Sequence, residues 1–169
     1  MICKKGRTMN FTLLLSSSYV KLDDFALCNL KVDSEWFGIH SKIENYGLYY
    51  YLYKGSPKVG VAFEDTLINL TQGELTSTKS HLDKSIIIET SDDCDILIFN
   101  TLDKSQDWTG SLVTDTFTCD NDNSYLICLD GSPTVNSTTL QKFDYDKLTS
   151  GKEYSVTLNG GVLGLFTKV

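Results

Sequence analysis

The chain has 169 residues, 41% of them hydrophobic, and a formal net charge of −7 at pH 7. This length suffices for one domain with a buried core and is short for two. Nucleic acids and anionic membranes both need a basic face on a protein, and the largest basic cluster here is Lys4–Arg7. We therefore expect neither nucleic acid nor a membrane as a partner.

The N-terminal segment is expected to lie outside the folded domain. Residues 1–10 are interpreted as a disordered extension or the product of an upstream start, with Met9 as the alternative start. The apolar stretch Leu13–Leu15 is shorter than the roughly 7–15 residues of a signal-peptide core. Five cysteines without CxxC spacing indicate free thiols in a reducing compartment, so the expected location is the cytoplasm.

Alternation of apolar and polar residues with a period of two dominates the rest of the chain, and no segment sustains the 3.6-residue period of an amphipathic helix. Short apolar runs between clusters of Gly, Asn, Asp and Ser are typical of strands in an all-β protein. In chain order, strands are predicted at residues 46–55, 58–64, 65–70, 85–90, 95–101, 111–119, 124–131, 133–136, 140–145, 153–158 and 161–168.

Two segments of the N-terminal half have an ambiguous pattern. Residues 21–30 and residues 71–85 are predicted as short helical or loop decorations. Residues 11–169 are interpreted as a single all-β barrel or sandwich domain, with helix below about 15% of residues against a usual third. The Asn-Gly pair of "LNGG" at residues 158–161 predicts a tight hairpin turn, because it tolerates positive φ angles.

The C-terminal stretch "YLICLDGSPTVNSTTLQKFDYDKLTSGKEYSV" resembles the last part of the cupin, or double-stranded β-helix, pattern. In that pattern a strand ends in L-x-G, a hairpin carries V-N-G, and a Gly-Asp turn precedes P-x-G-x-x-H and a final apolar strand. The matching pieces are "LDG" at 129–131, "TVNS" at 134–137, Asp144 with Phe143 in place of glycine, and "TSG" at 149–151.

The resemblance implies a single-domain, cupin-like jelly-roll barrel, which is normally a dimer. The short tail is also similar to small cupin-like proteins of tailed bacteriophages, which would place this chain in the host cytoplasm.

The resemblance also marks a departure from metal-binding cupins, which take His-x-His and Glu from a first motif and His from a second. In this chain the position of the Glu falls on Ser124, and that of the last His falls on Tyr154. The His pair falls either on Thr118 and Asp120 or on Phe117 and Cys119. The only histidines, His40 and His81, lie upstream. We therefore expect no metal centre and no cofactor.

Two acidic segments admit a chemical interpretation beside a plainer one. "DNDNSY" at 120–125 begins like a calcium loop, but Tyr125 and Gly131 stand where an EF-hand needs Gly and Glu. "SDDCD" at 91–95 groups three carboxylates beside Cys94, and neighbouring carboxylates raise one another's pKa in acid–base sites. Aspartates are also common in turns. Solvated turns are the favoured interpretation of both segments.

The candidate site consists of aromatic residues and one histidine. His40 shares a strand face with Trp36 and is a candidate general base or ligand contact, or else a packed edge residue. The tyrosines between residues 46 and 53 would line a pocket, form a dimer interface or simply lie exposed on a strand. The candidate catalytic residues are His40 and Tyr154, and the candidate pocket residues are Trp36, Tyr49, Tyr51, Tyr125 and Tyr154.

Three functions remain open from the sequence. The favoured one is a non-enzymatic, metal-free binding or assembly protein, expected as a homodimer with a small-molecule or carbohydrate ligand. The second is a metal-independent isomerase or epimerase acting on a sugar-like molecule, with His40 and a tyrosine as base and acid. The third is a virion structural protein, such as a head decoration or tail protein.

The tail gives the sharpest structural expectation. Gly131 is predicted as the turn residue of a hairpin in "DGSPTVNS", and Val135 is predicted to pack in one core with the final strand. Alternation puts Val162, Gly164 and Phe166 on one face of that strand and Leu163, Leu165 and Thr167 on the other. Since both faces are mostly apolar, we expect a buried strand and not an edge strand.

Overall fold

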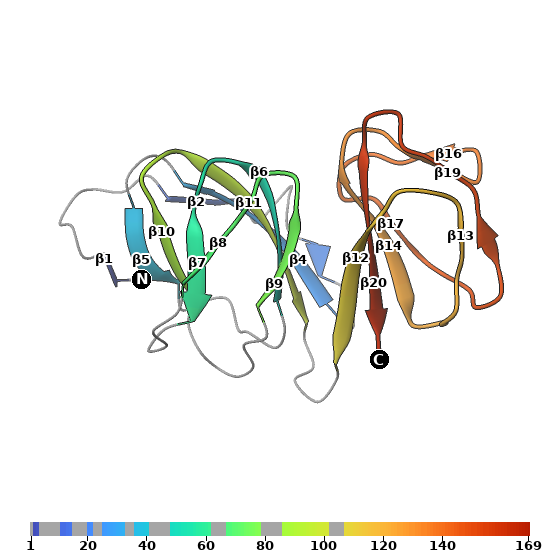
Figure 1. Ribbon diagram of the computed structural model, residues 1–169, viewed down its shortest axis with the longest axis horizontal. Helices are drawn as coiled ribbons and strands as arrows, with labels where there is room; N and C mark the ends of the chain where they lie inside the picture. Colours follow the sequence, from blue (N-terminus) through green and yellow to red (C-terminus); the bar gives the residue numbers. More distant parts are fainter. Residues whose placement is uncertain are drawn as a thin grey trace. The chain divides into compact units, whose positions relative to one another are not determined.

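The computed structural model describes residues 2–3, 11–14, 20–21, 25–32, 36–40, 48–61, 67–78, 86–101 and 107–169. Only β-strands are present in these ranges, with no helix among them (Figure 1), which confirms the predicted all-β class. The described part of the chain has no helix long and apolar enough to cross a membrane.

The chain divides into two compact units, Met1–Ser105 and Gln106–Val169. The single domain expected over residues 11–169 stays a prediction, because a division into compact units does not show whether either unit folds alone. Of the expected N-terminal extension, residue 1 and residues 4–10 lie outside the described residues, whereas Ile2–Cys3 form strand β1.

The first unit contains two antiparallel sheets within its described residues. The five-stranded sheet has the order β1, β5 (Trp36–His40), β10 (Ile86–Thr90), β7 (Lys58–Val61) and β8 (Leu67–Asn69). The other sheet, called the large sheet below, has the order β2 (Phe11–Leu14), β4 (Phe25–Val32), β11 (Cys94–Thr101), β6 (Leu48–Lys54) and β9 (Leu75–Thr78), with β3 (Val20–Lys21) also paired to β4. Strands β7 and β8, which follow each other along the chain, pair antiparallel.

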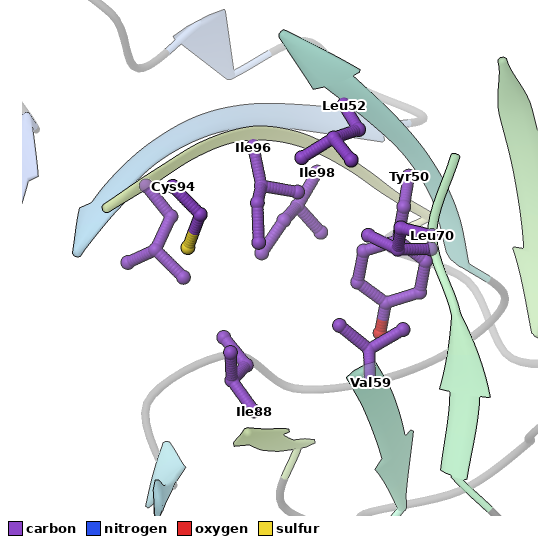
Figure 2. Close-up of a cluster of buried hydrophobic side chains, with 9 residues drawn as sticks. Tyr50, Leu52, Val59, Leu70, Ile88, Cys94, Ile96 and Ile98 are labelled. Carbon is purple, nitrogen blue, oxygen red and sulfur yellow. The ribbon is translucent and has the colours of Figure 1, made fainter. Parts of the chain in front are cut away.

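The two sheets of this unit pack against each other through a cluster of buried side chains (Figure 2). Alternate residues of β4, β6 and β11 contribute from the large sheet, because successive residues of a strand point to opposite faces. The members of the cluster are Leu30, Tyr50, Leu52, Val59, Leu70, Ile88, Cys94, Ile96 and Ile98. Burying each Leu, Ile or Val contributes about 1.5–3 kcal/mol.

The opposite face of the large sheet, called the outer face below, is also largely apolar. Phe25 and Leu27 of β4 and Leu97 and Phe99 of β11 are buried on it. The rings of Phe25 and Phe99 stack with centroids 4.9 Å apart. Strand β11 therefore buries both faces, which explains its unbroken apolar run "ILIF".

The two segments predicted as helical or loop decorations contain strands where they are described. Residues 25–30 belong to β4, so the helical interpretation of residues 21–30 is wrong there. A strand that is apolar on both faces offers apolar residues at almost any spacing, and Phe25 and Leu30 lie on opposite faces of β4. In the second segment, Leu75–Thr78 form β9, while residues 79–85 lie outside the described residues.

The second unit is described throughout residues 107–169 and contains three small antiparallel sheets. One has the order β12 (Trp108–Val113), β20 (Val162–Lys168), β14 (Ser124–Asp130) and β17 (Tyr145–Lys147). The others are β13 (Phe117–Thr118) with β18 (Glu153–Tyr154), and β16 (Thr138–Thr139), β15 (Thr134–Val135) and β19 (Val156–Thr157) in that order. Their core is formed by Val113, Cys119, Leu126, Cys128, Val135, Leu148, Tyr154 and Leu163, called the C-terminal core below.

The final strand β20 lies between β12 and β14, which confirms that it is not an edge strand. Leu163 joins Val135 in the C-terminal core and Leu165 packs against it, as predicted. Phe166 is fully buried but lies on the opposite face of β20, so its prediction as a member of the same core is wrong. A Cβ on Gly164 would lie 2.7 Å from its ring, so glycine makes room for Phe166 on that face.

The hairpin of the tail lies a few residues later than predicted. Strands β15 and β16 pair around Asn136 and Ser137, whose φ angles are 47° and 68°. A two-residue turn with positive φ at both positions matches the twist of paired strands, and asparagine tolerates it. Gly131 also has a positive φ, 69°, but it directly follows the last residue of β14 and lies before the hairpin.

The "LNGG" turn has the predicted backbone, with φ angles of 50° at Asn159 and 77° at Gly160. The N–H of Gly161 donates to the carbonyl of Leu158 at 2.6 Å. The strands that it joins, β19 and β20, belong to different sheets, so it is a tight turn and not a hairpin.

Candidate functional site

The position of the last histidine in the cupin pattern is filled by an aromatic stack. Tyr154 of β18 lies directly opposite Phe117 of β13, and their rings stack with centroids 5.6 Å apart. The Tyr154 side chain is 2% exposed and belongs to the C-terminal core. The residue at this position therefore packs in the core, whereas the cupin pattern has a metal-binding imidazole here.

A second departure from the pattern compensates for the buried tyrosine. The Tyr154 hydroxyl accepts a hydrogen bond of 2.9 Å from the backbone N–H of Thr149. The cupin pattern has proline at the position of Thr149, and proline has no N–H to donate. Tyrosine in place of histidine and threonine in place of proline thus form one hydrogen-bonded pair, in which the buried tyrosine hydroxyl is satisfied.

The other positions of the first cupin motif are satisfied within the protein as well. Ser124 is 3% exposed, and its hydroxyl lies 2.9 Å from that of Thr167. The Cys119 thiol donates to the carbonyl of Asn121 at 3.2 Å. Nowhere in the described ranges do three or more His, Cys, Asp or Glu side chains gather closely enough to hold a metal ion. These residues do not fit a metal held by imidazoles.

The buried thiols are poor nucleophiles. Burial, followed by the nearby carboxylates of Asp144 and Asp130, raises the pKa of the Cys128 thiol to about 11. Burial likewise raises the pKa of Cys94 to about 12. Because the thiolate is the reactive form, neither side chain is suited to covalent catalysis at neutral pH.

The Gly-Asp turn of the cupin pattern keeps its conformation although its glycine is Phe143. The φ angle of Phe143 is 72°, in the left-handed region that costs a residue with a side chain about 1–2 kcal/mol. The N–H of Phe143 donates to the carbonyl of Cys128 at 2.7 Å, and the Asp144 carboxylate accepts the N–H of Gln141 at 2.7 Å. The resemblance therefore identified the right turn, with its aspartate in a structural role.

The structure supports the interpretation of the acidic segment 91–95 as a turn and not as an acid–base site. The Asp92 carboxylate lies 2.9 Å from the Thr90 hydroxyl and accepts the Ser56 N–H at 3.2 Å. Hydrogen bonds from Thr90 and then Ser56 lower the pKa of Asp92, which is opposite to the rise that an acid–base site would need. This carboxylate links the β10–β11 turn to the β6–β7 turn, where Gly55 has a φ of 95°.

The "DNDNSY" loop uses its polar groups to hold the chain together. The Asp122 carboxylate accepts the N–H of Ser150, and the Ser150 hydroxyl donates to the Asp120 carbonyl at 3.1 Å. The side-chain oxygen of Asn121 accepts the N–H of Asn123 at 2.8 Å. These bonds attach the loop before β14 to the "TSG" segment, as expected for a structural turn.

The structure separates the sequence-predicted pocket residues. Tyr49 and Tyr51 share the outer face of the large sheet, whereas Tyr50 points into the cluster between the sheets (Figure 2). In the second unit, Tyr154 lies in the C-terminal core, and Tyr125 lies on the other face of β14, its ring 5.9 Å from that of Trp108.

Trp36 and His40 are at the two ends of β5, opposite Thr90 and Ile86 of β10. Their side chains lie outside the described part of the structure, so the catalytic candidate His40 stays a prediction.

Two polar residues of the outer face are Asn29, which sequence reasoning missed, and Asp95, which it gave only as part of the acidic segment 91–95. Asn29 is 3% exposed in the middle of β4, and Asp95 begins the apolar stretch of β11. The available signal was a single asparagine within the otherwise apolar run "FALCNL", since an unpaired amide is costly to bury.

By sequence, the chain matches no known protein family and no curated protein. Its fold is similar to several solved structures. Oxalate decarboxylase of Lactobacillus farciminis, solved as a formate complex, aligns with a TM-score of 0.65 and 9% identity over 94% of this chain and 84% of that one. HutD of Pseudomonas fluorescens SBW25 aligns with a TM-score of 0.63 and 10% identity, covering 96% of this chain and 100% of that one.

A cupin 2 conserved barrel domain protein of Leptotrichia buccalis aligns with a TM-score of 0.53 and 10% identity over 99% of this chain and 92% of that one. The chain is therefore an all-β protein of the cupin, or jelly-roll, fold, as the tail of its sequence predicts. Likenesses at this level of identity extend to the fold and not to activity.

Proposed function

We propose that this protein is a non-enzymatic, cupin-fold binding or assembly protein without a metal centre. The observation that carries the proposal is the stack of Tyr154 on Phe117, with the Tyr154 hydroxyl held by the N–H of Thr149. A tyrosine that is buried in the core in this way does not supply the imidazole nitrogen that a metal-binding cupin has at this position. The raised pKa values of Cys94 and Cys128 add that the buried thiols are not nucleophiles.

Metal analysis of the purified protein tests the absence of a metal centre. Protein prepared without chelators, and again after incubation with zinc, manganese, iron or nickel salts and gel filtration, should contain far less than one metal ion per chain. Stoichiometric metal in either sample would overturn this part of the proposal.

Solvent-exchange measurements test the absence of catalysis. An isomerase or epimerase that removes a proton from carbon would introduce deuterium from D2O into an aldose substrate, and a His40→Gln variant would lose this activity. We expect no incorporation by the parent protein above that of buffer. Incorporation that depends on His40 would establish the enzymatic alternative.

The proposal includes a homodimer, as the cupin resemblance implies. If a phage carries the gene, the dimer is located in the cytoplasm of the bacterial host. The mass in solution should then equal two chains at low and at high protein concentration. A trimer would favour the third reading, a virion decoration protein, over a cytoplasmic dimer.

A further inference from the structure

Strand β12 has one side without a neighbouring strand. It stands at the end of the order β12, β20, β14, β17, and within the described residues it pairs only with β20. The other strands at sheet ends in the described part of the chain have two to four residues, whereas β12 has six. A long edge strand is a template for pairing with another chain.

The ladder between β12 and β20 shows which backbone groups of β12 point outward. The N–H of Val169 donates to the carbonyl of Asp107, one residue before β12, at 2.8 Å. Hydrogen-bonded and non-hydrogen-bonded pairs alternate along an antiparallel ladder, so every second residue from Asp107 onward bonds to β20. The residues between them, Trp108, Gly110 and Leu112, therefore point their N–H and C=O groups away from β20.

Solvent reaches this edge of the sheet. Thr109 and Ser111 are exposed, and Gly110 between them is partly exposed. Because glycine has no side chain, the exposed area of Gly110 belongs to its main chain. A second strand can therefore approach the main chain of β12 at its centre.

Strand β12 lacks the features that protect an edge. Its six described residues, "WTGSLV", include no charge and no proline, and they pair with β20 without a bulge. Edge strands that remain single commonly carry a charge, a proline or a bulge, or are very short. The opposite edge of the same sheet, β17, is protected in this way, because it has three residues and two of them are Asp146 and Lys147.

A second, antiparallel copy of β12 matches this edge. With Gly110 of the two copies opposite each other, Trp108 lies opposite Leu112 of the partner. In the same register Thr109 lies opposite Ser111 of the partner. Apolar side chains then face apolar ones and hydroxyls face hydroxyls, and such cross-strand pairs stabilise a sheet. Trp108 and Leu112 are half-buried, so both have area left to bury.

The neighbouring registers lose this match. A shift of one residue towards the C-terminus places Trp108 opposite Thr114 of the partner. A shift towards the N-terminus places Leu112 opposite Gln106 of the partner. Both shifts oppose an apolar side chain to a polar one, so the register centred on Gly110 is favoured.

The charges of the chain agree with this choice of edge. Each copy has a net charge of −7, so like charges brought together at an interface would add to the repulsion between copies. Strand β12 brings none, and the adjacent Asp107 lies opposite Val113 of the partner. Two copies of β17 centred on each other would instead place Asp146 opposite Asp146 of the partner.

We propose that two copies of this chain associate through β12, antiparallel and about a two-fold axis at Gly110. This inference rests on the homodimer of the proposed function and names its interface. Gly110 exchanges both of its outward hydrogen bonds with Gly110 of the partner, and Leu112 exchanges its own with Trp108 of the partner. The two four-stranded sheets become one continuous sheet.

Cysteine cross-linking tests the interface and its register. Thr109 and Ser111 of the partner form a non-hydrogen-bonded pair, with Cα atoms about 4.5 Å apart, which is within the range of a disulfide. A mixture of Thr109→Cys and Ser111→Cys proteins, incubated so that subunits exchange and then mildly oxidised, should form a disulfide-linked dimer. Either variant alone should form far less, because its two new cysteines are diagonal neighbours at about 7–8 Å.

The parent protein, oxidised in parallel, gives the background from the five native cysteines. A mixture that does not exceed this background would overturn the inference. Cross-linking of either variant alone that equals the mixture would also overturn it, because the strands would then pair in another register.

The mass in solution of a Gly110→Pro variant is the second measurement. Proline removes the outward N–H, and an edge strand tolerates proline where that N–H faces away from the sheet. We expect the mass to fall from two chains to one, with the circular dichroism of the parent. The matched control is Lys147→Pro on β17, where the bond from Leu148 to Ser124 shows that Lys147 faces away from β14. This control should keep the mass of two chains.

A folded Gly110→Pro protein that stays a dimer would overturn the inference and would leave the homodimer with another interface. If this variant does not fold, the cross-linking result decides. A monomeric parent would overturn the inference together with the expected homodimer. None of these results bears on metal content or deuterium incorporation, which test the rest of the proposed function separately.

Discussion

The C-terminal core and the outer face of the large sheet treat their buried polar groups in opposite ways. In the core, the Tyr154 hydroxyl is held by Thr149 and the Ser124 hydroxyl by Thr167. On the outer face, Asn29 and Asp95 each keep an oxygen without a donor. An unsatisfied buried group costs about 1–3 kcal/mol, so these two oxygens should lower the stability of the outer face relative to that of the core.

The largest expected effect tests how well the C-terminal unit is packed. Phe166 is fully buried on the central strand β20, so Phe166→Ala should lower the free energy of unfolding by about 3–5 kcal/mol. The measurement is a urea or guanidinium melt followed by circular dichroism. Val169→Ala, at a 71% exposed residue of the same tail, is the control and should change stability little.

An unchanged midpoint for Phe166→Ala would show that the last strand is peripheral. The cupin-like alignment of the tail would then have to be withdrawn.

The next effect concerns the pair of Thr149 and Tyr154. Thr149→Pro restores the residue of the cupin pattern but removes the N–H donor, so it should cost about 1–3 kcal/mol by leaving the tyrosine hydroxyl unsatisfied. In a Tyr154→Phe background the same change should cost much less, because no hydroxyl remains to be satisfied. A double-mutant cycle of denaturant melts measures this coupling, and additive effects would contradict it.

The third effect is a gain of stability and tests the unsatisfied polar groups of the outer face. Asn29→Leu removes an amide whose oxygen is unsatisfied from an apolar face and should raise the free energy of unfolding by about 1 kcal/mol. The measurement is again a denaturant melt. A loss of stability would show that the amide has a structural partner, and the contrast between the outer face and the C-terminal core would lose its second half.

Much of the fold was predictable because it depends on local patterns. Period-2 alternation predicted most of the strands from β6 to β20, whereas β9 lies in a segment that was interpreted as a helical or loop decoration. The spacing of the tail predicted the cupin resemblance. The positive φ angles of the 158–161 turn followed from Asn-Gly, because this pair accepts a conformation that other residues resist. The helical interpretation of residues 21–30 failed because a strand buried on both faces shows no alternation.

The site was less predictable because it depends on which strands become neighbours. The stack of Phe117 on Tyr154 and the bond from Thr149 follow from the pairing of β13 with β18, strands of two residues each. The adjacency of Asn29 and Asp95 follows from the pairing of β4 with β11, which are far apart in sequence. Hydrophobic patterns identify which residues are buried, but they do not specify the register of distant strands.

The smallest expected effect concerns Asp92, a satisfied carboxylate on the turn just before Asp95. Hydrogen bonds from Thr90 and Ser56 lower its pKa in the folded protein below the ordinary value of 3.8. A depressed folded pKa adds stability that is fully present above the unfolded pKa and is lost as the pH falls through the folded pKa. Protonation of Asp92 should therefore weaken the protein only in strongly acidic solution. Because the carboxylate is exposed, the effect should be small.

Urea melts of the parent and of Thr90→Val at a series of pH values measure this contribution. Thr90→Val keeps the shape of the buried side chain but removes the hydroxyl that is the first cause of the shift. The midpoint of the parent should exceed that of the variant by a constant amount from about pH 5 upwards, and the difference should shrink as the pH falls below the unfolded value. A difference that stays constant down to the acid limit would mean that the Thr90 hydroxyl stabilises the turn only through its hydrogen bonds with the Asp92 backbone. Asp92 would then be no better satisfied than Asp95, and the contrast between the two carboxylates would disappear.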